Sequence, residues 1–171
     1  MDRDEWLDEL FRSCADRVLA YLLHRTDRES AQDVLQEVFV TAYRKADELP
    51  DPPIGWLLGT ARRLLANDNR GARRRDELAR RLATQPTTMN ESDDSATATA
   101  VGEALAGLSA NDREVLTLSA WYGLTGEEAA RALGCSASTY AVRLHRARHR
   151  LADRLRAAGY AGLRSAEVAH D

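Results

Sequence analysis

The sequence predicts an all-α protein in which a flexible linker joins two small helical domains, the second containing a helix-turn-helix. Apolar residues recur at spacings of three and four along most of the 171-residue chain, which is the period of an amphipathic helix. No segment alternates apolar and polar residues over the length of a strand. A stretch from 84 to 99 is rich in Ser, Thr, Asn, Asp and Ala and has almost no apolar content, so we expect a tether there.

The first domain is placed at residues 1–81, with a linker at 82–100. Three amphipathic helices are expected within it, at 7–22, 31–46 and 54–65. Thr26 or Asp27 can cap the second of these helices. The prolines at 50, 52 and 53 end that helix and form a stiff loop before the third.

The second domain is placed at residues 101–157, and a C-terminal tail at 158–171. One helix starts near Val101, and Ser109 is a suitable N-cap for the next. Thr125 and Glu128 have the spacing of a capping box, and Gly134 can stop the short helix that follows in a left-handed conformation. A three-residue turn to Ser136 then leads into a long helix, which is the spacing of a helix-turn-helix.

The long helix after Ser136 has two contrasting faces. Its apolar stripe contains Tyr140, Leu144, Ala147, Leu151 and Leu155. The residues expected to contact DNA are polar or cationic and comprise Ser136, Ser138, Thr139, Arg143, Arg146, Arg148 and Arg150. Ser138, Thr139 and Arg143 come first and are expected to read bases, whereas the later arginines are expected to contact phosphates. The alternative is that this arginine-rich face is simply solvated.

Charge is unevenly distributed, although the net charge is only −3. Residues 1–61 carry 7 basic and 13 acidic side chains, whereas 62–81 carry 8 basic and 3 acidic ones. This basic block suits contact with a nucleic-acid backbone, and the aromatic ring that precedes it suits base stacking. The residues concerned are Trp56, Arg62, Arg63, Asn67, Arg70, Arg73 and Arg74. A solvated helix end is the alternative interpretation here.

Several classes of function are disfavoured. No clustered carboxylates, nucleophile–base pair or phosphate loop indicates an enzyme. The two cysteines are far apart, and the pair His145 and His149 lacks a third ligand, so we expect neither a metal nor a cofactor. No apolar run approaches the ~18 residues of a membrane span, and the acidic N-terminus is unlike a secretion signal. We therefore expect a cytoplasmic protein.

The motifs together resemble a known family. The segment Asp33-Val-Leu-Gln36-Glu37-Val-Phe39 is similar to the core-polymerase-binding helix of bacterial sigma-70-family sigma factors. The segment from Gly55-Trp56-Leu-Leu into the arginine block resembles the part that recognises and melts the minus-ten element, and 124–151 resembles the minus-thirty-five reader. Their order and the linker are those of the short extracytoplasmic-function (ECF) group.

The resemblance implies a transcription initiation factor that binds core RNA polymerase and directs it to specific promoters. Asp33, Gln36 and Glu37 would then meet the clamp of the beta-prime subunit, and an anti-sigma factor would be a further partner. The resemblance places the minus-ten contacts in the basic block and a base-capturing loop at 49–54. It also implies that the protein catalyses nothing.

Two departures from the family pattern affect the DNA-binding segments. Asn67 stands where the family often has an aspartate, and Tyr140-Ala141-Val142 replaces a common Val-Lys-Ser. The missing lysine removes a phosphate contact, so the promoter sequence does not follow from the resemblance. The alternative function is a polymerase-independent helix-turn-helix regulator, with an N-terminal dimerisation or sensing module.

Overall fold

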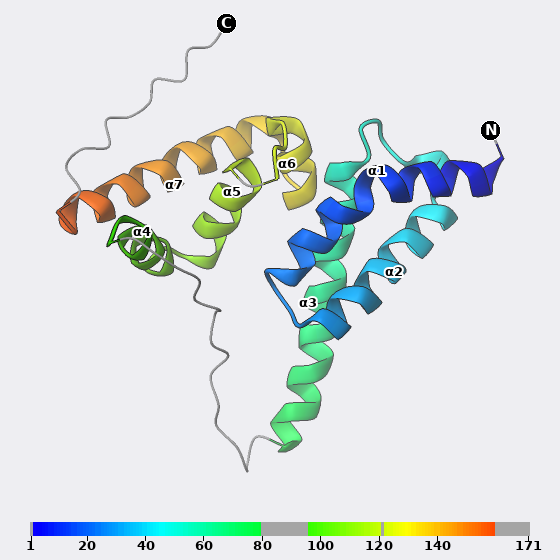
Figure 1. Cartoon of the computed structure of the whole chain (residues 1–171), viewed down its shortest axis with the longest axis horizontal. Helices are drawn as coiled ribbons and strands as arrows, with labels where there is room; N and C mark the ends of the chain where they lie inside the picture. The colour runs from blue at the N-terminus through cyan, green and yellow to red at the C-terminus, as the bar shows by residue number, and fades with distance from the viewer. Residues whose placement is uncertain (1, 80–95, 121, 160–171) are drawn as a thin grey trace, which may run out of the picture. The chain divides into compact units, whose positions relative to one another are not determined.

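A computed structural model of the chain describes residues 2–79, 96–120 and 122–159. The regular structure of these residues is helical, which confirms the all-α prediction (Figure 1). The elements in chain order are α1 (Arg3–Leu23), α2 (Arg28–Arg44), the short 3-10 helix η1 (Ala46–Glu48), α3 (Ile54–Ala79), α4 (Ala96–Ala106), α5 (Ala110–Ala120), α6 (Gly126–Leu133) and α7 (Ala137–Ala157). None of the helices in the described ranges is both long and apolar enough to cross a membrane.

The elements form two compact units. The first contains α1, α2 and α3 together with α6, and the second contains α4, α5 and nearly all of α7. The predicted linker 82–100 and tail 158–171 lie mostly outside the described residues. However, α4 begins at Ala96, five residues before the predicted helix start at Val101. Its first five residues include three alanines, which have the highest helix propensity and extend the helix into a segment that lacks apolar periodicity.

Helices α1, α2 and α3 pack against one another pairwise around an apolar core. Asp2 caps α1 through a capping box with Glu5, and Asp27, one of the two predicted candidates, caps α2. The largest fully buried side chains of this core are Val18, Tyr21, Leu22, Val38, Ile54, Leu57 and Leu58. Most residues of the predicted apolar stripes of these three helices therefore face the core, whereas Phe11 of the first stripe is 46% exposed.

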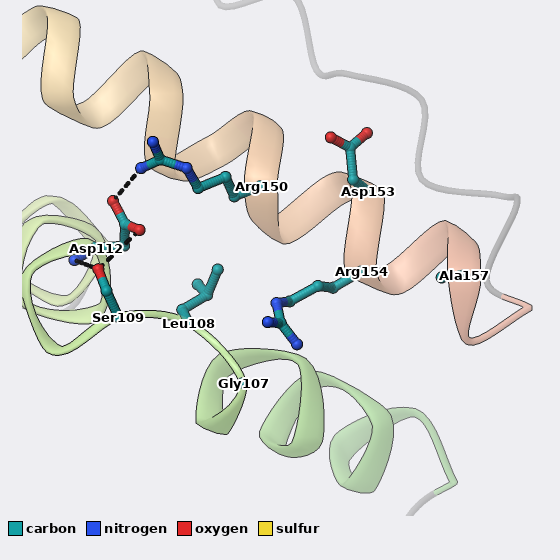
Figure 2. A pocket seen from close by; sticks show the side chains of 8 residues that line it. All are labelled: Gly107, Leu108, Ser109, Asp112, Arg150, Asp153, Arg154 and Ala157. Atoms are coloured by element: carbon teal, nitrogen blue, oxygen red, sulfur yellow. Dashed lines mark hydrogen bonds and ion pairs between the residues drawn. The ribbon is translucent and has the colours of Figure 1, made fainter.

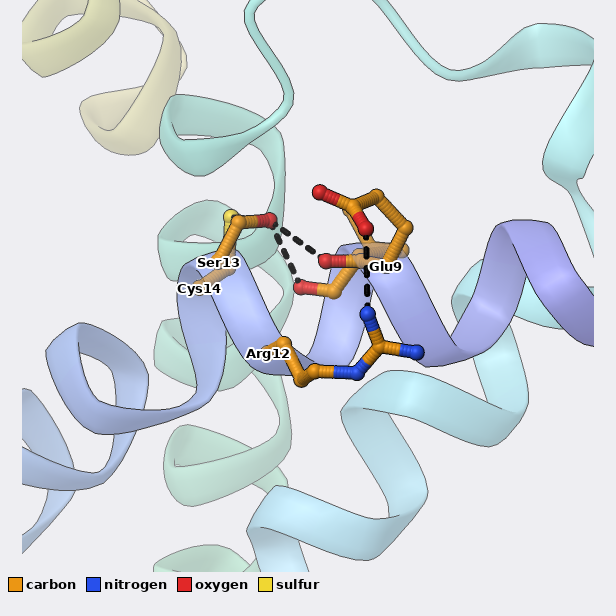
Figure 3. Close-up of polar contacts among 5 residues, drawn as sticks. Glu9, Arg12, Ser13 and Cys14 are labelled. Atoms are coloured by element: carbon orange, nitrogen blue, oxygen red, sulfur yellow. Dashed lines mark hydrogen bonds and ion pairs between the residues drawn. The ribbon is translucent and has the colours of Figure 1, made fainter.

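On the outer side of α1, short-range polar contacts follow the helix (Figure 3). The Ser13 hydroxyl donates to the Glu9 carbonyl at 2.8 Å, and Arg12 pairs with the Glu9 carboxylate at 3.2 Å. Cys14, next to Ser13, is a free thiol buried in the core. These contacts satisfy groups within one helix, so they contribute to α1 itself and create no site.

The second unit has a small core between α4, α5 and α7. Leu108, Leu116 and Ala147 form its buried centre, and Leu144 and Leu151 pack against it. Ser109 caps α5, because its hydroxyl accepts a hydrogen bond from the Asp112 amide at 3.1 Å. This confirms the predicted cap and sets where α5 begins.

Candidate nucleic-acid interface

The turn between α6 and α7 is built by local signals in the sequence. Thr125 and Glu128 form the predicted capping box: the Glu128 amide donates to the Thr125 hydroxyl at 3.2 Å, and the Thr125 amide donates to the Glu128 carboxylate at 2.7 Å. Gly134 has a φ of 66°, in the left-handed region that favours glycine, and ends α6 as predicted. The Cys135 amide then donates to the Ala130 carbonyl at 3.0 Å, which closes the turn before α7.

Helix α7 separates an apolar face from a polar one, as its sequence predicts. Tyr140, Ala147 and Leu155 are buried, and the Tyr140 hydroxyl donates to the Val115 carbonyl of α5 at 3.3 Å. Tyr140, which departs from the family pattern, therefore anchors α7 to α5. All of the residues predicted to contact DNA from this helix and its cap are exposed, namely Ser136, Ser138, Thr139, Arg143, Arg146, Arg148 and Arg150.

The arginines on α7 nevertheless differ in their surroundings. Arg150 pairs with Asp112 of α5 at 2.8 Å, and Arg148 donates to the Ser119 hydroxyl at 3.4 Å (Figure 2 shows the first of these contacts). In the part of the chain that the structure describes, no ion pair engages Arg143 or Arg146. Arg148 and Arg150, which are predicted to contact phosphates, therefore contact α5 in this structure. The guanidinium groups of Arg143 and Arg146 are open to solvent.

Figure 2 also shows a hollow between the α4–α5 turn and the last turns of α7. Arg154 extends across it toward Gly107, where a Cβ atom would collide with its guanidinium group. The hollow is lined by Leu108, Ser109 and Asp112 on one side and by Arg150 and Arg154 on the other. Ser109, Asp112 and Arg150 bond to one another at its edge, which ties α7 to the start of α5.

The predicted single-strand-binding residues follow one another along α3. Trp56 and Arg62 are half-buried, whereas Arg63 and Asn67 are exposed, and Arg63 donates to the Thr60 hydroxyl at 3.0 Å. The predicted residues Arg70, Arg73 and Arg74 lie in the same helix, but their side chains are outside the described part. Helix α3 thus continues without a break into the basic block, well past the predicted helix end at residue 65.

The outer face of α2 carries the three residues predicted to meet the polymerase. Asp33, Gln36 and Glu37 are all exposed, and their spacing of three and four places them on one stripe. Val40 extends this stripe by one turn and is 47% exposed, so an apolar side chain stands beside the three polar ones. The sequence prediction did not include Val40, although it lies seven residues after Asp33.

The two histidines on α7 lie close together. The rings of His145 and His149 meet edge to face, with 4.4 Å between their centroids. Among the residues that the structure describes, no group of three potential metal ligands occurs. The histidine pair is thus a ring contact on an exposed helix face.

Two family models match this chain, namely sigma-70 region 2 over residues 10–75 and sigma-70 region 4 over residues 98–151. The chain is 33% identical over 138 residues to the ECF RNA polymerase sigma factor SigD of Mycobacterium tuberculosis (strain ATCC 25618 / H37Rv), which covers 76% of this chain and 65% of SigD. It is 30% identical over 132 residues to SigL of the same strain, covering 73% of this chain and 75% of SigL. The match thus spans just under two thirds of the length of SigD.

Two solved structures have a similar fold. The sigma factor RpoE from Bartonella quintana, solved in complex with the anti-sigma factor NepR, matches with a TM-score of 0.64 and 23% identity over 87% of this chain and 96% of RpoE. CnrH, solved in complex with the cytosolic domain of CnrY, matches with a TM-score of 0.56 and 27% identity over 90% of each chain. The two family models match sigma-70 regions in the expected order, and the ECF factor SigL is 30% identical over three quarters of its length, so the chain belongs to the ECF group of the sigma-70 family of RNA polymerase sigma factors.

Proposed function

We propose that this chain is a transcription initiation factor that binds core RNA polymerase and directs it to specific promoters. The observation that carries the proposal is the order of three surfaces in one sigma-family chain. These surfaces are an exposed polar and acidic stripe on α2, a basic extension of α3, and an exposed cationic face on α7. Transcription takes place where the chromosome and the polymerase are, so we place the protein in the cytoplasm.

Helix α7 is proposed to enter the major groove of the minus-thirty-five element. Its N-terminal residues Ser138, Thr139 and Arg143 are exposed and lie where a recognition helix normally reads base edges. Arg146 lies one turn later and is open to solvent, so it suits a phosphate. In this division, base contacts set sequence preference and phosphate contacts set affinity.

Helix α3 is proposed to approach the minus-ten element and to stabilise its opened strand. Trp56 offers a ring for stacking, and the basic charge from Arg62 onward attracts the backbone. The loop 49–53, which precedes α3, is the proposed base-capturing segment; Ile54 at its end is only 2% exposed and belongs to the core. Asn67 in place of the common aspartate leaves this surface more basic.

The stripe on α2 is proposed to bind the clamp of the beta-prime subunit. Asp33 and Glu37 bring charge and Gln36 brings hydrogen-bonding groups, while the exposed Val40 supplies apolar area for a contact core. By analogy with RpoE, which was solved with the anti-sigma factor NepR, we propose that an anti-sigma factor also holds this chain. The protein catalyses nothing in this scheme.

The deciding experiment is transcription in vitro with purified bacterial core polymerase and genomic promoter fragments. We expect initiation that requires the chain, and we expect Glu37→Lys to reduce it, because this change reverses a charge on the proposed clamp contact. Asp16→Lys reverses an exposed charge on α1 and serves as the matched control that retains activity. Failure to initiate on every fragment, combined with specific duplex binding in the absence of polymerase, would instead support the self-sufficient regulator.

A second arm separates base reading from phosphate contact. Arg143→Ala is expected to relax discrimination at one promoter position by about 1–3 kcal/mol. Arg146→Ala is expected to weaken binding evenly across sequences and to lower the salt slope by about 1. Equal effects of both substitutions on all promoter sequences would contradict the assigned roles.

A further inference from the structure

Val142 is an exposed apolar side chain on α7, the helix proposed to read the minus-thirty-five element. Among the large apolar side chains that the structure describes, it has the greatest exposed fraction, 50%. It belongs to the segment Tyr140-Ala141-Val142 that departs from the family pattern, and it stands where serine is common. Tyr140 is buried and bonds to α5. Val142 is therefore the bulky residue of this departure that faces outward.

The position of Val142 around α7 places it opposite the core of its unit. Successive residues of an α-helix are about 100° apart, so Leu144 lies about 200° around the helix from Val142, and Leu151, nine residues later, lies about 180° around it. Both leucines pack against the buried centre of the second unit. The isopropyl group of Val142 therefore lies in the middle of the outward side of α7.

The neighbours of Val142 on the helix surface are the residues proposed to meet DNA. Residues three or four positions away adjoin it on the same side of the helix. All of them are polar and exposed, namely Ser138, Thr139, His145 and Arg146. The first two are proposed base readers, and Arg146 is a proposed phosphate contact. Val142 therefore lies at the centre of the surface that is proposed to enter the major groove.

One group in the major groove matches the chemistry of this side chain. Base edges there present hydrogen-bond donors and acceptors, and thymine adds its C5-methyl group. A valine side chain cannot hydrogen-bond, so pressing it against a donor or acceptor removes water from that group without replacing the lost hydrogen bond. Contact with the thymine methyl group instead removes apolar surface from water on both sides.

The charge around Val142 favours DNA as the occupant of this surface. Arg143 adjoins it in the chain and Arg146 lies one turn further on, and neither forms an ion pair among the described residues. A DNA groove supplies phosphates at its edges and base edges at its floor. One apolar side chain flanked by two arginines therefore complements a groove that holds a methyl group between phosphates.

We propose that Val142 is a specificity-determining residue that reads the C5-methyl group of one thymine in the minus-thirty-five element. This inference rests on the proposed function, since it assigns a base to the same DNA-binding helix. Serine, which is common at this position in the family, can hydrogen-bond to several base edges, whereas valine cannot. The chain should therefore prefer thymine where a serine-bearing relative has no need of a methyl group.

The test compares thymine with deoxyuridine, which pairs with adenine in the same way but lacks the C5-methyl group. Holoenzyme assembled from the full chain and core polymerase is bound to a promoter fragment on which it initiates, and each thymine of the minus-thirty-five element is replaced in turn. At one position we expect deoxyuridine to weaken binding about three- to fivefold, the effect of losing one buried methyl contact. At that position Val142→Ala should bind thymine and deoxyuridine equally.

Two further variants separate base reading from folding. Val142→Thr keeps the shape of the side chain and one of its two methyl groups, so it should retain a preference for thymine of about twofold. Leu23→Ala removes an exposed apolar side chain at the end of α1 and should keep the full wild-type preference. Alanine favours a helix more than valine does, so circular dichroism should show no loss of helix in Val142→Ala.

The outcomes distinguish this inference from the proposed function. If the wild-type holoenzyme initiates but no thymine of the element responds to loss of its methyl group, or the element contains no thymine, the inference is overturned and the proposed function stands. An effect that persists unchanged in Val142→Ala also overturns it, because another residue must then read that methyl group. If the wild-type chain initiates on no promoter, both fail together. A preference at one position that Val142→Ala abolishes and Leu23→Ala retains supports the inference.

Discussion

Replacing Arg150 with alanine tests whether this residue holds α7 in place or contacts DNA. Its guanidinium donates to the Asp112 carboxylate at 2.8 Å, and Asp112 also accepts a hydrogen bond from the Ser109 hydroxyl at 2.8 Å. The Arg150 side chain is 57% exposed and solvent screens it, whereas Asp112 is only 14% exposed. Exposed ion pairs contribute about 0.2–1 kcal/mol, and the covered carboxylate places this pair near the upper end, at about 1 kcal/mol.

The assay is thermal unfolding of the wild-type chain, the two single variants Arg150→Ala and Asp112→Ala, and the double variant. A loss of about 1 kcal/mol of unfolding free energy lowers the Tm of a small domain such as the second unit by about 4–8 °C. The double-mutant cycle should give a coupling energy between Arg150 and Asp112 of about 0.5–1 kcal/mol. Arg146→Ala is the control, because it removes the same exposed charge from α7 without breaking an ion pair among the described residues. The structural role of Arg150 would be refuted if the Tm changes of the two single variants simply add in the double variant and if Arg150→Ala also lowers the salt slope of promoter binding by about 1.

Three further predictions concern single residues. Tyr140→Phe removes the hydrogen bond to the Val115 carbonyl and should lower the free energy of unfolding by about 1 kcal/mol; no change in the urea midpoint would contradict it. Gly134→Ala forces a Cβ into the left-handed turn and should cost about 1–2 kcal/mol in the same assay. Hydrogen bonds from Ser30 hold the pKa of Asp27 below its ordinary value of 3.8. This folded-state pKa lies below the unfolded one, so the cap's contribution is present above about pH 4 and is lost as the pH falls through the lowered pKa. Asp27→Asn should therefore flatten the pH dependence of α2 unfolding in that window, followed by circular dichroism.

Much of the second unit follows from its sequence because the signals are local. The capping box at Thr125, the left-handed Gly134 and the cap at Ser109 each depend on residues within one turn of the position they determine. The faces of α7 follow from periodicity for the same reason. Periodicity does not identify the partner of an exposed charge, because Arg150 and Asp112 are 38 positions apart in the sequence. The pattern alone is equally consistent with an arginine that faces solvent or DNA.

The α3–α6 contact depends even less on local sequence. Each of Gly55 and Gly59 weakens a helix interior by about 0.5–1 kcal/mol relative to alanine, and no local pattern indicates what offsets that cost. The offsetting contact comes from Glu128 and Ala132, which follow on the far side of the linker. Helix α3 thus uses an apolar face toward α1 and α2 and a glycine face toward α6, and only the first of these follows from the periodicity of its sequence.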